Sequence, residues 1–83
     1  MSYEKVNQAK RIVVGTKQTL KLLESGNVAE VLVAEDADPK VTAKVIQLCE
    51  KARITVTYVD SMRKLGKAAG IDVGAAVVSL LKE

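Results

Sequence analysis

The stretch "VVGTKQTLKLLESG", residues 13 to 26, begins like a strand, turns at Gly15 and continues at helical spacing to Gly26. The first turns of this helix hold two lysines, a glutamine and two threonines, and no acid. A helix N-terminus carries a partial positive charge and normally attracts Asp or Glu. The sequence therefore predicts a positively charged, hydrogen-bonding helix N-terminus without the acid that usually accompanies one.

The sequence contains few residues that could carry out catalysis. Histidine, the commonest general base and a common metal ligand, is absent. Cys49 falls on the apolar stripe of a helix, which favours core packing over nucleophilic work. No Gly-rich phosphate-binding motif is present. We therefore predict a protein that is not an enzyme and that needs no cofactor.

Three acids that lie close together, Glu35, Asp36 and Asp38, are a second candidate for chemistry, as ligands of a hard metal ion. Asp38 already stands where a helix needs its N-cap, and no Gly-rich chelating loop surrounds the three acids. We predict no metal site here. A small α/β enzyme remains an alternative function, which the missing histidine disfavours.

Charge is distributed unevenly along the chain, whose net charge is +3. Residues 1–23 hold five basic groups against one acid, residues 24–60 hold seven acids against four bases, and residues 61–83 hold four bases against two acids. If the fold brings the two ends together, one face is basic and the other acidic, and the basic face suits a polyanion such as nucleic acid. A solvated surface with a chance imbalance fits these charges equally well.

The aromatic residues are only two, Tyr3 and Tyr58. Modules that grip single-stranded nucleic acid stack its bases on aromatic side chains. If this protein binds nucleic acid, we expect it to read a folded shape through phosphates and base edges.

The length of 83 residues suits one small domain, which we expect to comprise residues 1–83. We see no secretory signal, and the apolar stretch from Ala75 to Leu81 is too short to span a bilayer. A single cysteine fits a reducing compartment. We expect a cytoplasmic protein with no membrane partner.

Strands and helices are predicted to alternate along the chain. Gly26 is placed like a C-terminal cap, and Asp38 and Pro39 mark a helix start. Helices are expected over about 3–9, 16–25, 39–52 and 62–69, and strands start at "RIVV" and cover 28–35, 54–59 and 75–81. This pattern predicts an α/β fold, a three-layer α-β-α sandwich with a mixed sheet of about four strands. We expect the buried positions of the sheet to be Val31, Val33, Val56, Val77 and Leu80. Within its helix, Gly66 indicates close approach to another backbone, in the protein itself rather than in a ligand.

Three segments, "GTKQTLK" (15–21), "VAEDADP" (33–39) and "SMRKLGKAAGIDVGAA" (61–76), resemble in order and spacing the motifs of the ribosomal L-seven-Ae family of kink-turn RNA-binding proteins, bacterial members included. The family fold is an α-β-α sandwich, which agrees with the prediction from the element pattern. Family members recognise the kink-turn, an RNA duplex bent sharply at a short bulge beside tandem sheared G·A pairs. The resemblance implies that an RNA phosphate and guanine edges supply the negative charge missing from the helix end.

The resemblance also implies which residues bind RNA. It places Gly15, Thr16, Lys17, Gln18 and Lys21 on the RNA-facing helix end, and Ile71, Asp72 and Val73 on a loop that packs on the bulged nucleotides. Lys17 stands where the archaeal motif has Asn, and Gln18 where it has Glu. Gln18 keeps an acceptor oxygen without its charge, so we expect affinity to rely more on electrostatics.

The lysines suit guanine directly, because its O6 and N7 accept hydrogen bonds from such donors. Lys17, Gln18 and Lys21 stand at i, i+1 and i+4, so they project from one side of the first turns. The alternative is that the lysines are a solvated helix face and that Ile71 and Val73 cover the core.

We expect a monomer that binds a kink-turn in rRNA or another structured RNA, without DNA as a partner. A constitutive large-subunit ribosomal protein is an alternative within RNA binding. A protein-interaction module that uses the acidic middle segment is an alternative outside it.

Overall fold

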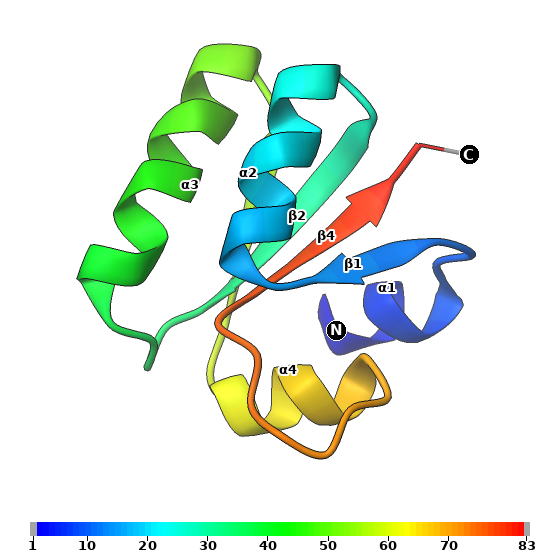
Figure 1. The fold of residues 1–83 in the computed structure, drawn as a ribbon. Helices are drawn as coiled ribbons and strands as arrows, with labels where there is room; N and C mark the ends of the chain where they lie inside the picture. The colour runs from blue at the N-terminus through cyan, green and yellow to red at the C-terminus, as the bar shows by residue number, and fades with distance from the viewer. Residues whose placement is uncertain (1, 83) are drawn as a thin grey trace.

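The computed structural model of the protein describes residues 2–82. Strand and helix alternate after a first helix, in the predicted order (Figure 1). The elements are α1 (Ser2–Gln8), β1 (Ile12–Val14), α2 (Thr16–Ser25), β2 (Val28–Ala34), α3 (Pro39–Ala52), β3 (Thr55–Val59), α4 (Met62–Ala68) and β4 (Val77–Leu81).

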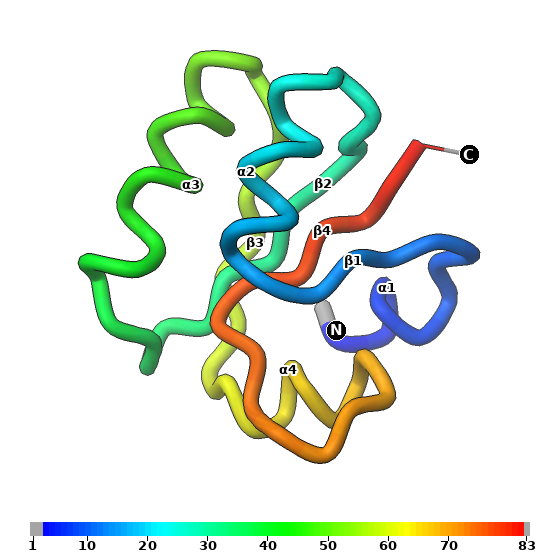
Figure 2. The backbone as a smooth tube through the Cα atoms, viewed as in Figure 1, coloured from blue at the N-terminus to red at the C-terminus, as the bar shows by residue number. Residues whose placement is uncertain are grey.

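The four strands form one mixed sheet in the order β1-β4-β2-β3. Strand β4 is antiparallel to both of its neighbours, and β3 is parallel to β2. Strands β1, β2 and β3 therefore run in one direction and end together, at Val14, Ala34 and Val59. We call this edge the carboxyl end of the sheet. Helices α2, α3 and α4 follow these strands, so all three begin at the carboxyl end (Figure 2).

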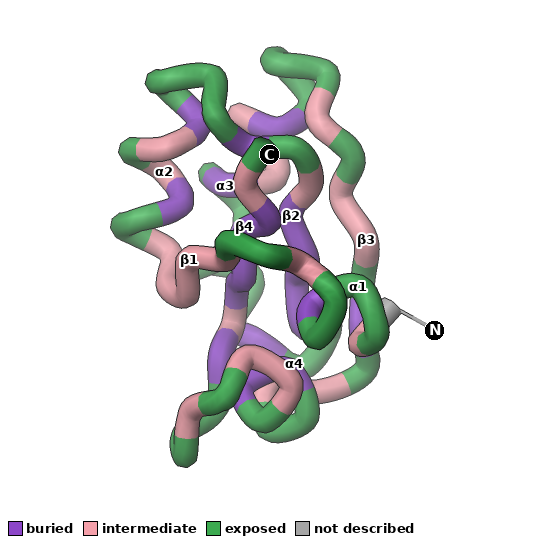
Figure 3. The backbone as a smooth tube through the Cα atoms, turned by 90° about the vertical axis from the view of Figure 1, so that its right-hand side faces the viewer, coloured by how far each residue is buried: buried purple, intermediate pink, exposed green. Residues whose placement is uncertain are grey.

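Two helices cover each face of the sheet, which confirms the predicted three-layer sandwich. Helices α2 and α3 pack side by side on one face, and α1 and α4 on the other (Figure 1). Figure 3 shows that burial is concentrated in the central strands β2 and β4, whereas the outer helix surfaces are exposed. The central strands are apolar on both sides because a helix layer covers each side.

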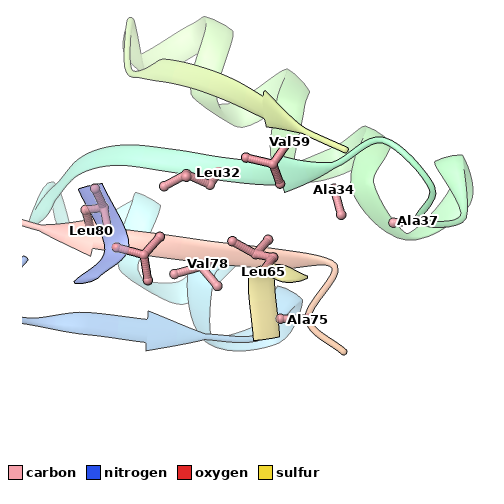
Figure 4. Close-up of a cluster of buried hydrophobic side chains, with 9 residues drawn as sticks. Leu32, Ala34, Ala37, Val59, Leu65, Ala75, Val78 and Leu80 are labelled. Atoms are coloured by element: carbon pink, nitrogen blue, oxygen red, sulfur yellow. The ribbon is translucent and has the colours of Figure 1, made fainter. Parts of the chain in front are cut away.

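A separate apolar core fills the space on each side of the sheet. On the α1/α4 side, Leu32, Leu65 and Val78 form the centre of one cluster (Figure 4). On the α2/α3 side, Val31, Val45 and Cys49 belong to the other. Cys49 is fully buried, and this burial raises the pKa of its thiol, so the thiolate that nucleophilic work requires is disfavoured.

The ends of the strands and the burial at the sheet edge differ in detail from the prediction. Val31, Val33, Val77 and Leu80 are buried as we expected, but Val56 is only half-buried because β3 is an edge strand. The strands begin at Thr55 and Val77, one and two residues later than predicted, and β2 ends at Ala34, one residue earlier. Ile54, Ala75 and Ala76 are apolar but lie outside the strands, so apolar composition alone starts β3 and β4 too early.

The glycine within α4 is explained by a backbone contact. A Cβ atom placed on Gly66 would lie 2.0 Å from the carbonyl oxygen of Val73. The Gly66 carbonyl in turn accepts a hydrogen bond of 3.0 Å from the Ile71 N–H. The predicted close approach is therefore confirmed, and it holds the loop over residues 70–76 against α4.

We predict that Gly66→Ala destabilises the protein by about 1–3 kcal/mol, because the added methyl group meets backbone that cannot move independently. Helix propensity alone would instead stabilise the variant by roughly 1 kcal/mol. The free energy of unfolding in urea distinguishes the two by sign. Gly26→Ala is the comparison, because Gly26 has a φ of 77° but a Cβ atom there would have no neighbour within 4 Å. The cost of that substitution, about 1–2 kcal/mol, should come from the left-handed backbone conformation alone. A Gly66→Ala variant as stable as the parent would contradict this account of the loop.

Candidate functional site

The carboxyl end of the sheet gathers three helix N-termini, and two of them are capped by polar side chains. Asp38 caps α3, where its Oδ1 accepts a hydrogen bond of 2.9 Å from the Lys40 N–H. Ser61 caps α4 by accepting from the Lys64 N–H at 3.0 Å. Asp36 adds a second acceptor to α4, at 2.8 Å from the Met62 backbone nitrogen. Both helices therefore have their positive ends complemented from within the chain.

Helix α2 is the exception among these three. Its N-cap is Gly15, which has no side chain to accept a hydrogen bond. The first N–H groups of an α-helix have no partner within the helix. Backbone donors and the positive end of the helix dipole therefore face outward together here, which is the arrangement that binds anions.

The backbone conformation at Gly15 favours glycine, and the Gln18 side chain lies close to it. The φ of 117° at Gly15 lies in a region that side chains disfavour, and a Cβ atom there would lie 2.6 Å from Oε1 of Gln18. The carboxamide of Gln18 therefore folds back over the start of its own helix. This conformation places a donor NH₂ and an acceptor oxygen beside the uncapped amide groups.

Lys17 and Lys21 add two cations to the same helix end, and both side chains are exposed. They are one helical turn apart, a separation of about 6 Å along the axis. Thr16 is half-buried and Gln18 is exposed. The helix end thus combines backbone donors, an amide and two lysines, which together suit a phosphate next to hydrogen-bonding base edges.

A buried polar contact fixes α2 on the sheet directly behind this end. The Thr19 hydroxyl donates to Ser79 Oγ on β4 at 3.2 Å, and the Ser79 hydroxyl is also 3.2 Å from the Val13 carbonyl oxygen on β1. Both hydroxyl residues are fully buried. Buried hydroxyls need such partners, so the contact fixes the position of α2 relative to two strands.

The predicted loop residues 71–73 divide into one that covers the core and two that do not. Ile71 is half-buried and packs against the α1/α4 core. Asp72 is exposed, and Val73 is 70% exposed, the largest exposed fraction among the large apolar side chains described. Covering the core therefore explains Ile71 but not Val73, which presents an apolar surface to solvent.

The loop and the helix end lie at the same end of the molecule. The Gly15 N–H donates to the Val77 carbonyl oxygen at 3.0 Å, and Val77 is the first residue of β4 after the loop. The loop itself crosses the carboxyl end between α4 and β4 (Figures 1 and 2). The two groups of residues, 15–21 and 71–73, that the resemblance assigned to RNA binding therefore lie toward the same end of the molecule.

Two acids, Glu30 and Asp60, make structural contacts away from the α2 end. Glu30 accepts from Lys5 at 3.1 Å and from the Thr57 hydroxyl at 2.6 Å. Asp60 accepts from Tyr3 and, at 3.1 Å, from Lys64, and these hydrogen bonds lower the pKa of its carboxyl group.

Among residues 2–82 no three His, Cys, Asp or Glu side chains are grouped so that they could hold a metal ion. None of the helices described is both long and apolar enough to cross a membrane.

The largest hollow described does not belong to this site. It is a shallow groove of about 750 Å³ beside α1 and the end of β4, lined in part by Lys5, Glu30 and Leu80. None of the site residues lines it. The candidate site is an exposed surface rather than a pocket, which suits a large ligand.

Comparison with known proteins identifies the family of the chain. The family model described as ribosomal protein L7Ae/L30e/S12e/Gadd45 matches residues 2–83. The chain belongs to this L7Ae family. An RNA-binding protein from Halalkalibacterium halodurans is 60% identical over 99% of this chain and 100% of its own length. The RNA-binding protein YbxF from Geobacillus stearothermophilus is 56% identical, with the same coverage.

Solved structures agree with the L7Ae fold of the chain. A 15.5 kD RNA-binding protein from Giardia lamblia superposes with a TM-score of 0.86 at 28% identity, over 99% of this chain and 74% of that one. A protein of unknown function from Bacillus halodurans superposes with a TM-score of 0.83 at 24% identity, over 96% of this chain and 80% of that one, and supports the fold alone. The L7Ae chain described here is thus an RNA-binding family member with an uncapped helix at the carboxyl end of its sheet.

If α2 lacks an anion at its N-terminus, supplying one within the chain should stabilise the protein. We predict that Lys17→Glu raises the free energy of unfolding by about 1 kcal/mol, because it replaces a cation with an acid at the positive helix end and changes a Lys–Lys pair at i, i+4 to Glu–Lys. Urea denaturation at low salt measures the change. Lys82→Glu alters the net charge equally outside any helix and should leave stability unchanged. Destabilisation by Lys17→Glu would show that the α2 end is already satisfied.

Proposed function

We propose that this L7Ae family member recognises and stabilises kink-turns in structured RNA, without catalysing a reaction. The observation that carries the proposal is the contrast among the three helix ends at the carboxyl end of the sheet. Helices α3 and α4 have acids or hydroxyls on their first amides, whereas α2 presents its amides, Lys17 and Lys21 to solvent. An RNA phosphate and the edges of guanines supply the acceptors that α2 lacks.

In this proposal each part of the site has a distinct task. The uncapped amides of α2 and the lysine ammonium groups bind phosphate and guanine acceptors, and Gln18 offers an acceptor oxygen to a guanine N–H. The exposed Val73 packs on an unstacked nucleotide, because bulged bases present apolar faces outside the duplex. Ile71 holds this loop next to α4, because its N–H donates to the Gly66 carbonyl oxygen, and the exposed Asp72 stands beside Val73 on the same loop.

The absence of an aromatic side chain among residues 15–21 and 71–73 accounts for the type of RNA proposed. The described site has no aromatic side chain on which single-stranded bases could stack. Recognition then depends on a backbone already bent so that phosphates and G·A edges reach one helix end together. A protein that binds the bent state more tightly shifts the RNA population toward it. We further propose that it acts in the cytoplasm as a monomer.

Side chains that read bases should matter more than remote cations. Gln18→Ala or Lys21→Ala should weaken kink-turn binding about tenfold or more, since a good base-edge contact discriminates by roughly 1–3 kcal/mol. Lys82→Ala, remote from the carboxyl end of the sheet, should change affinity little. Titration of labelled RNA with each variant at fixed salt measures the three effects. Equal losses for all three variants would indicate general attraction to a polyanion.

Bending of the RNA tests the proposed function itself. With a donor and an acceptor dye on the two duplex arms, energy transfer should rise when protein is added to a kink-turn RNA. The control RNA has its sheared G·A pairs converted to Watson–Crick pairs, and it should show no rise. If both RNAs bind equally and neither bends, the protein is a nonspecific RNA binder.

A further inference from the structure

Helix α3 carries a row of lysines that the proposed kink-turn site does not use. Lys40, Lys44 and Lys51 are all exposed, whereas Thr42, Val45 and Cys49 form the buried side of this helix. At about 100° per residue, the three lysines fall within roughly 40° of one another and opposite the buried side. They form a straight row about 16 Å long on the outermost surface of the helix.

In the part of the chain that the structure describes, none of these three lysines forms an ion pair with an acid. The ion pairs found among residues 2–82 join Lys5 to Glu30 and Lys64 to Asp60, and none involves α3. Residues 24–60 carry more acids than bases. Their acids are in part engaged in the caps of α3 and α4 and in the contacts of Glu30 and Asp60, so the α3 row stays positive.

The placement of the row is unfavourable for α3 taken alone. Lys40 is the second residue of the helix, where the dipole disfavours a cation. Lys40 and Lys44 stand at i, i+4, where like charges destabilise a helix by about 0.2–0.5 kcal/mol. Helix α2 repeats the arrangement, with Lys17 and Lys21 at its second and sixth positions. Helices α2 and α3 are neighbours that begin at one end of the sheet (Figure 1). They thus expose lysines at matching positions.

We infer that the α3 row, Lys40, Lys44 and Lys51, binds the phosphate backbone of an RNA arm that extends from the kink-turn. The inference rests on the proposed function, because it is the α2 end that brings the RNA to this layer of the molecule. An RNA strand presents evenly spaced negative charges along a line, which a straight row of cations complements. Contacts of this kind position the duplex without reading its sequence.

RNA is a better partner for this row than an acidic protein because of where the row lies in the fold. Lys40 begins the row at the carboxyl end of the sheet, next to the helix end that lacks an anion, so one polyanion can reach both. The described surface of α3 offers little apolar area beyond Val41, which is 42% exposed. A protein interface would normally bury more apolar surface at its centre.

The test compares the salt dependence of binding to two kink-turn RNAs, one with arms extended by a full helical turn and one cut back to the pairs that flank the kink. Each lysine that contacts a phosphate should contribute about one unit to the slope of log K against log salt. The wild-type slope should be steeper for the long RNA by about 3. In the variant Lys40→Gln/Lys44→Gln/Lys51→Gln the two slopes should become equal, while short-RNA affinity stays within twofold of wild type.

Two further variants separate charge from folding. The triple exchange of the same lysines to Arg keeps the charges and should keep the steep slope. Gln47→Lys adds a fourth cation to the row without removing any contact, and should steepen the slope by about one for the long RNA alone.

Equal slopes for the two RNAs with the wild-type protein would overturn the inference. An unchanged slope in the Gln variant would also overturn it, and the row would then serve another partner such as an acidic protein. Failure of the proposed function looks different. The short RNA would then bind no better than its Watson–Crick-paired control, whatever α3 contributes.

Discussion

This structure depends on one constraint: three helix N-termini, each with a partial positive charge, lie together at one end of the sheet. Because β1, β2 and β3 run in the same direction, the helices that follow them must all begin at the carboxyl end. Three such ends repel one another unless acceptors satisfy them. Asp36, Asp38 and Ser61 satisfy two, and the chain leaves the third, at Gly15, for a ligand.

The rest of the fold keeps that open end in place. The buried Thr19–Ser79–Val13 contact ties α2 to two strands, and the Gly15–Val77 hydrogen bond ties its start to the end of the 70–76 loop. That loop is held in turn by the contact between Gly66 and Val73. An uncapped helix and exposed lysines lower the stability of the free protein, so the site is maintained by packing behind it rather than by its own contacts.

The sequence allowed the elements and the acid-free start of α2 to be predicted, because their signals are local. Gly26 and Asp38 are caps that act on neighbouring residues, and the missing acid near Lys17 is visible without any fold. The edge position of β3, which leaves Val56 half-buried, depends on strand order and has no local signal. The capping role of Asp36 toward Met62 likewise joins residues 26 positions apart. A sum of charge over residues 24–60 does not reveal the α3 row either, since acids engaged in contacts and exposed lysines count equally in a sum.

The central claim is that the uncapped start of α2 binds the RNA, and backbone amide resonances report on it residue by residue. In a nitrogen–proton correlation spectrum recorded during titration with kink-turn RNA, the amides of Thr16, Lys17 and Gln18 should move furthest, because hydrogen bonds to an anion form at those groups. The amides of Lys40 and Met62, already bonded to Asp38 and Asp36, should move less. If the α2 amides stay in place while RNA binds and the largest changes appear elsewhere, the account is contradicted.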